Sequence, residues 1–205
     1  MIQIIIFDLG NVLIHVDPRK TLPYFMKKLK KIPEEVIYKY LYESSLLRDY
    51  EKGYMDDRAF INGVRDQLQV RFSDRFFRKC WNGILSPIQP VMDLIPVLCQ
   101  QYQLMALSNS NKMHIDFCMK QFPVLSRFHD MILSYGVGFC KPEPEMFQIA
   151  LERSKCPAEQ VLFIDDLSEN VAGAKKTGMQ AVQFKGYHNL IQTLAKFDIH
   201  PDMGS

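Results

Sequence analysis

Features that would assign the chain to a membrane or secretory class are missing from this sequence. Its 205 residues contain no apolar stretch approaching the ~20 residues that a membrane-spanning helix needs. No basic region precedes the first apolar run, and an aspartate ends that run too early for a signal peptide. Internal repeats and low-complexity segments are also lacking. We therefore expect a globular protein of the cytoplasm.

Paired cysteines are missing as well. The cysteines are odd in number, scattered and never spaced as C-x-x-C; they are Cys80, Cys99, Cys118, Cys140 and Cys156. This pattern argues against a zinc site and against a disulfide framework. It favours a reducing compartment, in agreement with the expected location.

The chain also lacks a strong excess of charge of one sign. Its net charge is +2, so we expect neither nucleic acid nor a membrane as a partner. The charge is uneven, because residues 18–85 carry 15 Lys and Arg against 9 Asp and Glu, whereas the remainder carries 10 against 14. A basic segment beside an acidic one would suit an anionic substrate over a metal site, but a solvated helical surface is the commoner explanation. The oligomeric state cannot be inferred.

The order of the predicted elements indicates an α/β fold with a helical insertion. Residues 4–7 form a short apolar run rich in β-branched residues, which is typical of a strand buried on both faces. Between Asp17-Pro18 and Ser86-Pro87 the apolar residues recur at helical spacing, and we expect four helices there and no strand. The length of the chain suffices for a core domain and a smaller inserted one.

From Pro90 onward, predicted strands and helices alternate. The strands are expected at 104–107, 131–133, 161–164 and 181–184, and the helices at 91–102, 112–122, 144–154, 168–177 and 189–197. Such alternation predicts a doubly wound parallel sheet of Rossmann-like type. We therefore divide the chain into an α/β core, residues 1–16 and 86–205, and an all-helical domain, residues 17–85.

Polar side chains follow several of the predicted strands directly. Asp8 follows the first strand, Ser108 the second, and Asp165-Asp166 the strand at 161–164, while Lys141 lies in the loop after another. In a parallel sheet the carboxyl ends share one edge, where open α/β sheets bind ligands. Each residue alone could be an ordinary cap or turn, but their coincidence at one edge is hard to explain structurally. We infer a functional site at this edge.

The three carboxylates of this set predict a metal site. Asp8, Asp165 and Asp166 would repel one another unless a cation joins them. Hard oxygen ligands with open positions suit Mg²⁺, which binds through one or two carboxylates together with substrate phosphate. Gly10 follows Asp8 by two residues, where the backbone must turn sharply and approach something closely.

In this order, these segments resemble the haloacid dehalogenase superfamily, whose members are mostly phosphatases. The matching segments are Phe7-Asp8-Leu9-Gly10-Asn11-Val12, Leu107-Ser108-Asn109, Lys141-Pro142-Glu143 and Phe163-Ile164-Asp165-Asp166. The helical domain corresponds to the cap that one branch of the family inserts after the first strand. The opening segment and the short cap most resemble bacterial sugar-phosphate phosphatases of the α-D-glucose-1-phosphate phosphatase type. We expect the cap to open and close on hinges near Val16-Asp17 and Ser86-Pro87.

The resemblance implies a covalent mechanism. Asp8 would attack phosphorus and form an aspartyl-phosphate, which water then hydrolyses. Mg²⁺ would be bound by Asp8, by the carbonyl of Gly10 and by Asp166, with Asp165 in a neighbouring role. The implied activity is that of a Mg²⁺-dependent phosphoric monoester hydrolase acting on a small phosphorylated metabolite, in particular a sugar phosphate.

The resemblance also implies how the phosphoryl group is held. The hydroxyl of Ser108 and the backbone amide of Asn109 would bind its oxygens. Lys141 would orient the nucleophile and stabilise the developing charge, and is implied to be catalytic together with Ser108. Leu9 and Gly10 complete the implied substrate-binding set.

One position departs from the family pattern. Most phosphatases of this family have a second aspartate two residues after the nucleophile, as general acid and base, and here that residue is Gly10. General acid–base catalysis is worth roughly 10²–10⁴-fold, so its loss should slow turnover or require a better leaving group, such as an anomeric sugar. Asn11, His15 or Asp17 could substitute, and we favour His15 because histidine titrates near neutrality.

Two alternative functions stay open at this point. A 2-haloacid dehalogenase shares the aspartate nucleophile and lacks the second aspartate, but it needs no metal, so the Asp165-Asp166 pair argues against it. A non-catalytic member of the same fold, binding a phosphorylated ligand or another protein, is compatible with Gly10.

Overall fold

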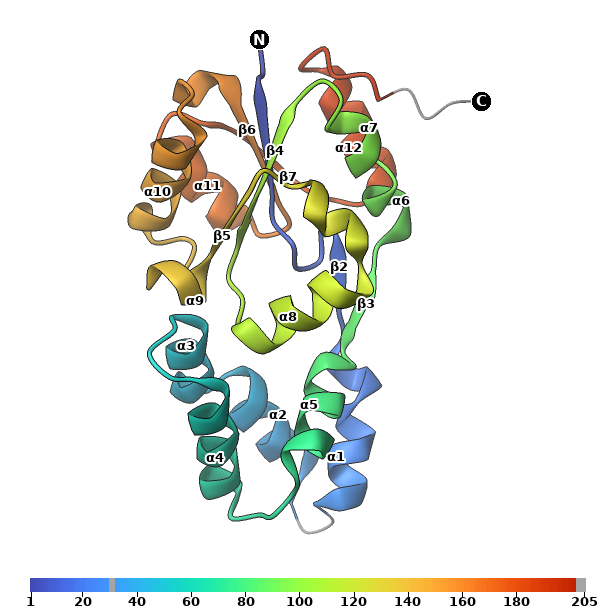
Figure 1. Ribbon diagram of the computed structural model, residues 1–205, viewed down its shortest axis with the longest axis vertical. Coiled ribbons are helices and arrows are strands. Elements are labelled where there is room, and N and C mark those ends of the chain that lie inside the picture. The colour runs from blue at the N-terminus through green and yellow to red at the C-terminus, as the bar shows by residue number, and fades with distance from the viewer. Residues whose placement is uncertain (30–31, 202–205) are drawn as a thin grey trace.

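The computed structural model describes residues 1–29 and 32–201 and contains a five-stranded parallel sheet (Figure 1). The strands are β1 (Ile4–Phe7), β4 (Gln103–Ser108), β5 (Asp130–Leu133), β6 (Val161–Asp165) and β7 (Gln180–Gln183). Their spatial order is β5-β4-β1-β6-β7, so β1 is central and fully buried between β4 and β6. Because every pair is parallel, the carboxyl ends lie at one edge. The predicted α/β fold class is confirmed.

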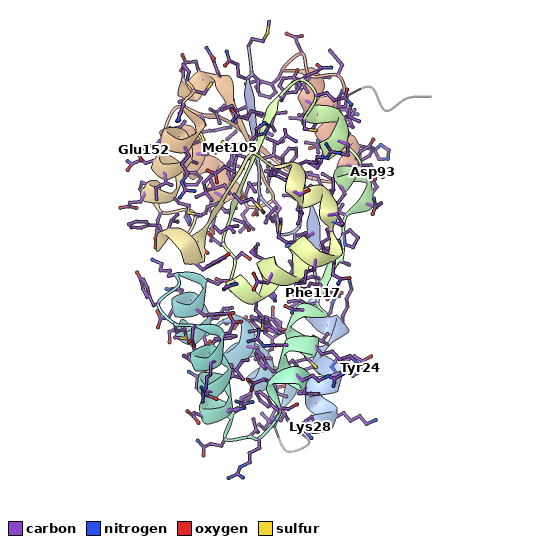
Figure 2. The ribbon with its side chains drawn as sticks, viewed as in Figure 1. Tyr24, Lys28, Asp93, Met105, Phe117 and Glu152 are labelled. Carbon is purple, nitrogen blue, oxygen red and sulfur yellow. The ribbon has the colours of Figure 1, made fainter. Side chains whose placement is uncertain are left out.

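Helices cover both faces of this sheet. One face packs against α6 (Gln89–Met92), α7 (Ile95–Leu98), α8 (Lys112–Gln121) and α12 (Tyr187–Ala195), and the other against α10 (Pro144–Ser154) and α11 (Ser168–Lys176). Short elements complete the core: α9 (Ser134–Val137) and the 3-10 helices η2 (Pro123–Arg127) and η3 (Ala158–Gln160). Figure 2 shows Met105 of β4 inside this layered core, whereas Glu152 of α10 and Asp93 point outward. The apolar interior therefore lies on both sides of β1.

The inserted segment forms a group of helices beneath the carboxyl edge of the sheet, called the cap below (Figure 1). It contains the 3-10 helix η1 (Pro18–Lys20) and helices α1 (Leu22–Lys28), α2 (Glu34–Tyr42), α3 (Ser45–Glu51), α4 (Asp57–Leu68) and α5 (Asp74–Asn82). Side chains of Ser44, Asp56 and Ser73 cap the last three of these helices. The cap has its own core of stacked aromatic rings, among them Tyr50 on Phe60 and Phe77 on Trp81. Across all described residues, no helix has the length and apolar character needed to cross a membrane.

A two-stranded antiparallel ribbon joins the cap to the core. Its strands are β2 (Ile14–Val16) and β3 (Leu85–Pro87), which run along one side of the molecule in Figure 1. Both chain crossings between the two parts are therefore paired with each other. The division at residues 17–85 and the hinge positions stay predictions; Val16 is the last residue of β2, and Ser86 and Pro87 lie within β3.

Besides the β2–β3 ribbon, which was not predicted, the structure differs from the predicted elements in three places. Residues 91–102 do not form one helix, because Pro96 has no amide hydrogen and its ring would clash with the carbonyl of Met92, so α6 and α7 are separate single turns. The cap contains α3 in addition to the four expected helices, since Ser44 starts a helix in a segment without a clear apolar stripe. The loop expected from Ser134 contains the single turn α9. The other helices and strands agree with the prediction to within about two residues.

Candidate active site

Asp8 stands at the carboxyl end of the central strand. Its backbone amide continues the ladder by donating to Ile164 at 2.9 Å. Asp8 is only 7% exposed. Its Oδ1 accepts a hydrogen bond from the Leu9 amide at 2.7 Å and forms an ion pair with Nζ of Lys141 at 2.9 Å. Among the described residues Oδ2 therefore has no recorded protein partner and is available for other chemistry.

Lys141 is buried between two carboxylates. Its Nζ lies 2.6 Å from Oδ2 of Asp165 in addition to the contact with Asp8, and its side chain is 1% exposed. The backbone of Lys141 is held by Asn109, whose side-chain amide donates to the Lys141 carbonyl at 2.8 Å and accepts from its amide at 2.7 Å. The end of β4 thus positions the lysine loop. This side-chain role of Asn109 differs from the predicted role of its backbone amide, which stays a prediction.

Asp165 is saturated with donors. Besides Lys141, it accepts from the Leu167 amide at 2.8 Å and from Nδ2 of Asn170 at 3.0 and 3.1 Å. These bonds tie the end of β6 to the first turn of α11. The geometry therefore suits a carboxylate that positions Lys141, which is the neighbouring role expected of it.

Asp166 completes a group of three acids. Oxygens of Asp8, Asp165 and Asp166 lie within 4.8 Å of one another. Burial raises the pKa of Asp8 to about 6, although Lys141 opposes the increase and Asp165 adds to it. Burial, followed by repulsion from Asp165, also raises the pKa of Asp166. A divalent cation would relieve this repulsion, and the all-oxygen donor set fits Mg²⁺.

Ser108 is the last residue of β4 and is buried beside these acids, next to the start of α8. The turn that follows is rigid, because Ser134 accepts from the amide of Ser110 and donates to its carbonyl, both at 2.9 Å. Asn111 then caps α8 by accepting from the amide of His114. Backbone amides and the positive end of a ten-residue helix thus follow β4, the strand that pairs with β1 before Asp8, and a helix start of this kind favours anions.

A cavity of about 140 Å³ separates this edge from the cap. Its floor includes Leu9, Gly10 and Ser108, and its walls include Glu51 and Trp81 of the cap. An adjoining cavity of about 360 Å³ reaches the Lys141 loop and shares the lining residues Tyr42, Leu47, Glu51 and Asn109 with the first. Of the substrate-binding residues expected from the sequence, Leu9, Gly10, Ser108 and Asn109 line the first cavity, and Asn109 and Lys141 line the second.

The three candidates for a substitute acid or base do not line this cavity. Ile14 and Val16 line it, and because side chains alternate along a strand, the exposed His15 between them points to the opposite side. Asp17 caps η1 and pairs with Arg19 at 2.9 Å. The side chain of Asn11 accepts from the Val16 amide at 3.2 Å. The role suggested for His15 stays a hypothesis, and its position does not favour it.

Two residues that no motif marks contribute to the cavity wall. His114 of α8 stacks on Trp81 of α5, with ring centroids 4.9 Å apart, and its Nε2 donates to the Trp81 carbonyl at 3.1 Å. Burial lowers the pKa of His114 to about 4, so its ring is neutral near pH 7. The sequence shows only a histidine on a helix and an aromatic residue in an apolar stripe. The pairing depends on how the cap sits on the core.

Comparisons with known proteins agree with this geometry. The family model of haloacid dehalogenase-like hydrolases matches residues 2–178. A D-ribitol-5-phosphate phosphatase of Bacteroides thetaiotaomicron is 26% identical over 190 residues, covering 89% of this chain and 92% of the relative. A glyceraldehyde 3-phosphate phosphatase of Methanothermobacter thermautotrophicus is 28% identical over 153 residues, covering 67% of this chain and 65% of the relative.

A solved structure is similar over nearly the whole chain. It is that of a haloacid dehalogenase family enzyme from Bacteroides thetaiotaomicron in complex with magnesium and inorganic phosphate, with a TM-score of 0.81 and 28% identity. The match covers 93% of this chain and 99% of that one. Since the family model spans most of the sequence, this protein belongs to the haloacid dehalogenase-like hydrolase family.

Proposed function

We propose that this protein is a Mg²⁺-dependent phosphoric monoester hydrolase that acts on a small phosphorylated sugar or polyol through an aspartyl-phosphate on Asp8. The observation that carries the proposal is the buried contact of Lys141 with Asp8 and Asp165, beside a third carboxylate at the same sheet edge. The names of the relatives support the substrate class, since they act on phosphates of ribitol and glyceraldehyde. The α-D-glucose-1-phosphate type stays a finer prediction.

The geometry of Asp8 suits a nucleophile. With Oδ1 held by Lys141 and by the Leu9 amide, Oδ2 attacks phosphorus while the bond to the leaving oxygen breaks. Water then attacks the aspartyl-phosphate and releases inorganic phosphate. Two easier steps replace one difficult one.

Lys141 and the turn after β4 stabilise the transferring group. The ammonium is immobilised by Asp165 and by the clamp from Asn109, so it needs no rearrangement during the reaction. Ser108 and the adjacent amides face the same oxygens. Phosphoryl transfer depends mostly on such positioning and charge stabilisation.

The residues that would hold Mg²⁺ are Asp8, Asp166 and the carbonyl of Gly10. When bound, the ion supplies positive charge that neutralises carboxylate and phosphoryl oxygens. Asp165 would remain outside this set, because its oxygens already accept from Lys141, Leu167 and Asn170. The adjacent acids Asp165 and Asp166 also argue against a 2-haloacid dehalogenase, because that enzyme needs no metal.

The test is a panel of phosphate esters assayed for phosphate release with Mg²⁺ and with a chelator. It includes D-ribitol 5-phosphate, glyceraldehyde 3-phosphate and α-D-glucose 1-phosphate. We expect Mg²⁺-dependent turnover that Asp8→Asn lowers by at least about 10³-fold, because the nucleophile is lost. The matched control, Asp93→Asn, changes an outward-pointing acid and should leave turnover unchanged (Figure 2).

Three outcomes would overturn the proposal. Metal-independent chloride release from a 2-chloro acid would assign a dehalogenase. Binding of phosphate and Mg²⁺ without turnover of any ester would indicate a non-catalytic member. Full activity of Asp8→Asn would exclude the covalent mechanism.

A further inference from the structure

Glu51 is the last residue of α3, and it lines, from the cap side, the cavity between the cap and the carboxyl edge of the sheet. It lines the cavity that Gly10 and Ser108 line from below, and also the adjoining one that reaches Asn109 and Lys141. Its carboxyl group thus stands where the two spaces join, opposite the sheet edge. No sequence motif points to it.

The carboxyl group of Glu51 is partly buried and, among the described residues, has no recorded hydrogen bond or ion pair. Burial raises its pKa to about 7, with Arg48 on the same helix opposing the increase. The titratable and charged groups that line the two cavities with it are Tyr42, Glu43, Arg48 and Lys52 in the cap, and His114, Cys140, Lys141 and Glu143 in the core.

Most of the charged neighbours are already paired. Lys52 lies 2.6 Å from Glu143, and Lys141 is held by Asp8 and Asp165. His114 is neutral, as described above, and burial raises the pKa of the Cys140 thiol. Glu51 is therefore a carboxyl group that can exchange a proton near neutral pH without breaking an ion pair.

Across the cavity, the position of the missing acid is open. A Cβ atom added at Gly10 would meet Cγ2 of Val16 at 3.8 Å, an ordinary contact, and the φ angle of Gly10 is not in the left-handed region. The space that an aspartate at this position would enter is thus available to a group that comes from the cap.

We propose that Glu51 is the general acid and base of this enzyme, supplied by the cap in place of the aspartate that Gly10 replaces. The inference rests on the phosphatase function proposed above. As Asp8 attacks and the ester bond breaks, the electron pair stays on the leaving oxygen, which takes the proton of the Glu51 carboxylic acid. The Glu51 carboxylate then accepts a proton from the water that attacks the aspartyl-phosphate. The net reaction of the two steps converts the phosphate ester and water into the alcohol and inorganic phosphate.

The position of α3 supports this role. Lys52, next in the chain, pairs with Glu143 beside Lys141, and the backbone of Gly53 packs against the Tyr135 carbonyl of α9. These contacts hold the end of α3 against the core. The acid is consequently in place only when the cap is closed.

The test compares Glu51→Gln with the parent on two esters in the presence of Mg²⁺. For a polyol phosphate, whose leaving alkoxide needs a proton, we expect kcat to fall roughly 10²–10⁴-fold. The leaving group of p-nitrophenyl phosphate is a stable anion that needs no proton. For this ester the rate constant for formation of the aspartyl-phosphate, measured from the burst of p-nitrophenol, should change only a few-fold. The decline of kcat for the polyol phosphate above about pH 7 should disappear in the variant.

Two further variants make the test specific. Glu35→Gln, an exposed acid on α2, should behave as the parent. In the double variant Gly10→Asp with Glu51→Gln, an aspartate enters the open space from the core side, and we expect it to recover most of the lost turnover. Circular dichroism and thermal melting check that each variant folds.

The proposal fails if Glu51→Gln slows the burst of p-nitrophenol as much as it slows release of the polyol, if it slows neither ester, or if it raises KM while kcat is unchanged. The last result would assign Glu51 to substrate binding. Loss of all activity in Asp8→Asn with full activity in Glu51→Gln rejects this inference alone. Absence of phosphate release by the parent from any ester rejects both proposals.

Discussion

At the scale of single residues, Lys141 determines the geometry of the site. It is a buried cation shared by two carboxylates, and Asn109 holds its backbone on both sides. A buried ion pair contributes little net stability, but removal of one partner leaves an uncompensated buried charge. Here the removal would leave two carboxylates facing each other.

We predict that Lys141→Met lowers kcat by about 10²–10³-fold and the free energy of unfolding by about 3–5 kcal/mol. Lys141→Arg should not restore activity, since the planar guanidinium does not fit a site built for one ammonium. The control Lys112→Met removes an exposed pair with Asp116 and should cost under about 1 kcal/mol. Enzyme kinetics and urea unfolding measure these effects. An active Lys141→Met variant would contradict the assigned role.

His114 predicts a dependence of stability on pH. Its pKa is lowered to about 4 in the folded protein, whereas the unfolded chain binds the proton near pH 6.5. The unfolded state therefore binds more protons as the pH falls from about 6.5 to about 4, and the free energy of unfolding should fall by at most about 3 kcal/mol over this window.

His114→Gln isolates this contribution. The difference in unfolding free energy between the parent and the variant should shrink as the pH is lowered from 7 toward 4, measured by urea unfolding at each pH. His188→Gln, on the exposed side of α12, serves as the control. Its unfolding free energy should change with pH as that of the parent does. A constant difference for His114→Gln would show that the folded protein accepts the proton without cost.

At the scale of elements, the residues that follow α3 pack closely against α9. Gly53 has φ +73°, and a Cβ atom there would lie 2.1 Å from the carbonyl oxygen of Tyr135. Gly138, at the end of α9, has φ +82° but no atom within 4 Å of such a Cβ. The two glycines share the backbone conformation and differ in the space around them.

Gly53→Ala should therefore affect cap closure, and Gly138→Ala should not. In both variants the left-handed backbone conformation should lower the free energy of unfolding by about 1–2 kcal/mol. Gly53→Ala should in addition force the cap away from the core. We expect it alone to lower kcat/KM, by about tenfold or more, which corresponds to 1.4 kcal/mol. Steady-state kinetics and thermal melting of both variants measure this. Equal kinetics in the two variants would contradict a role for the α3–α9 contact.

The same contacts explain how far the sequence could predict the site. The strands and the residues at their ends were predictable, because the short apolar runs before Asp8, Ser108 and Asp165 are local patterns. Helix α3 and the β2–β3 ribbon were not, since both are short and are stabilised by pairing with distant segments. Glu51 could not be recognised from the sequence either, because the residues that surround it come together only after the cap has folded onto the core.

At the scale of the whole molecule, the single tryptophan reports on the position of the cap. Trp81 belongs to the cap, is 1% exposed and stacks on His114 of the core. Separation of the two parts would remove this contact and bring water to the indole ring. Its fluorescence therefore measures opening without any added label.

We predict that Lys52→Gln, which removes the ion pair with Glu143, shifts the Trp81 emission to longer wavelength because the cap opens more often. Mg²⁺ together with inorganic phosphate should shift it back, since a ligand held between the two parts favours closure. Lys39→Gln, an exposed cap residue, should have the emission of the parent. An identical spectrum for Lys52→Gln, with and without ligand, would contradict this account of closure.

The pairing of β2 with β3 determines how such a motion proceeds. Because both crossings are hydrogen-bonded to each other, they bend together, and we expect the cap to rotate about one axis near the ribbon. Helix α3 lies on the side away from that axis (Figure 1), so the same rotation displaces it furthest. The entrance then widens first between α3 and α9, and the departing alcohol passes the carboxyl group of Glu51 on its way to solvent.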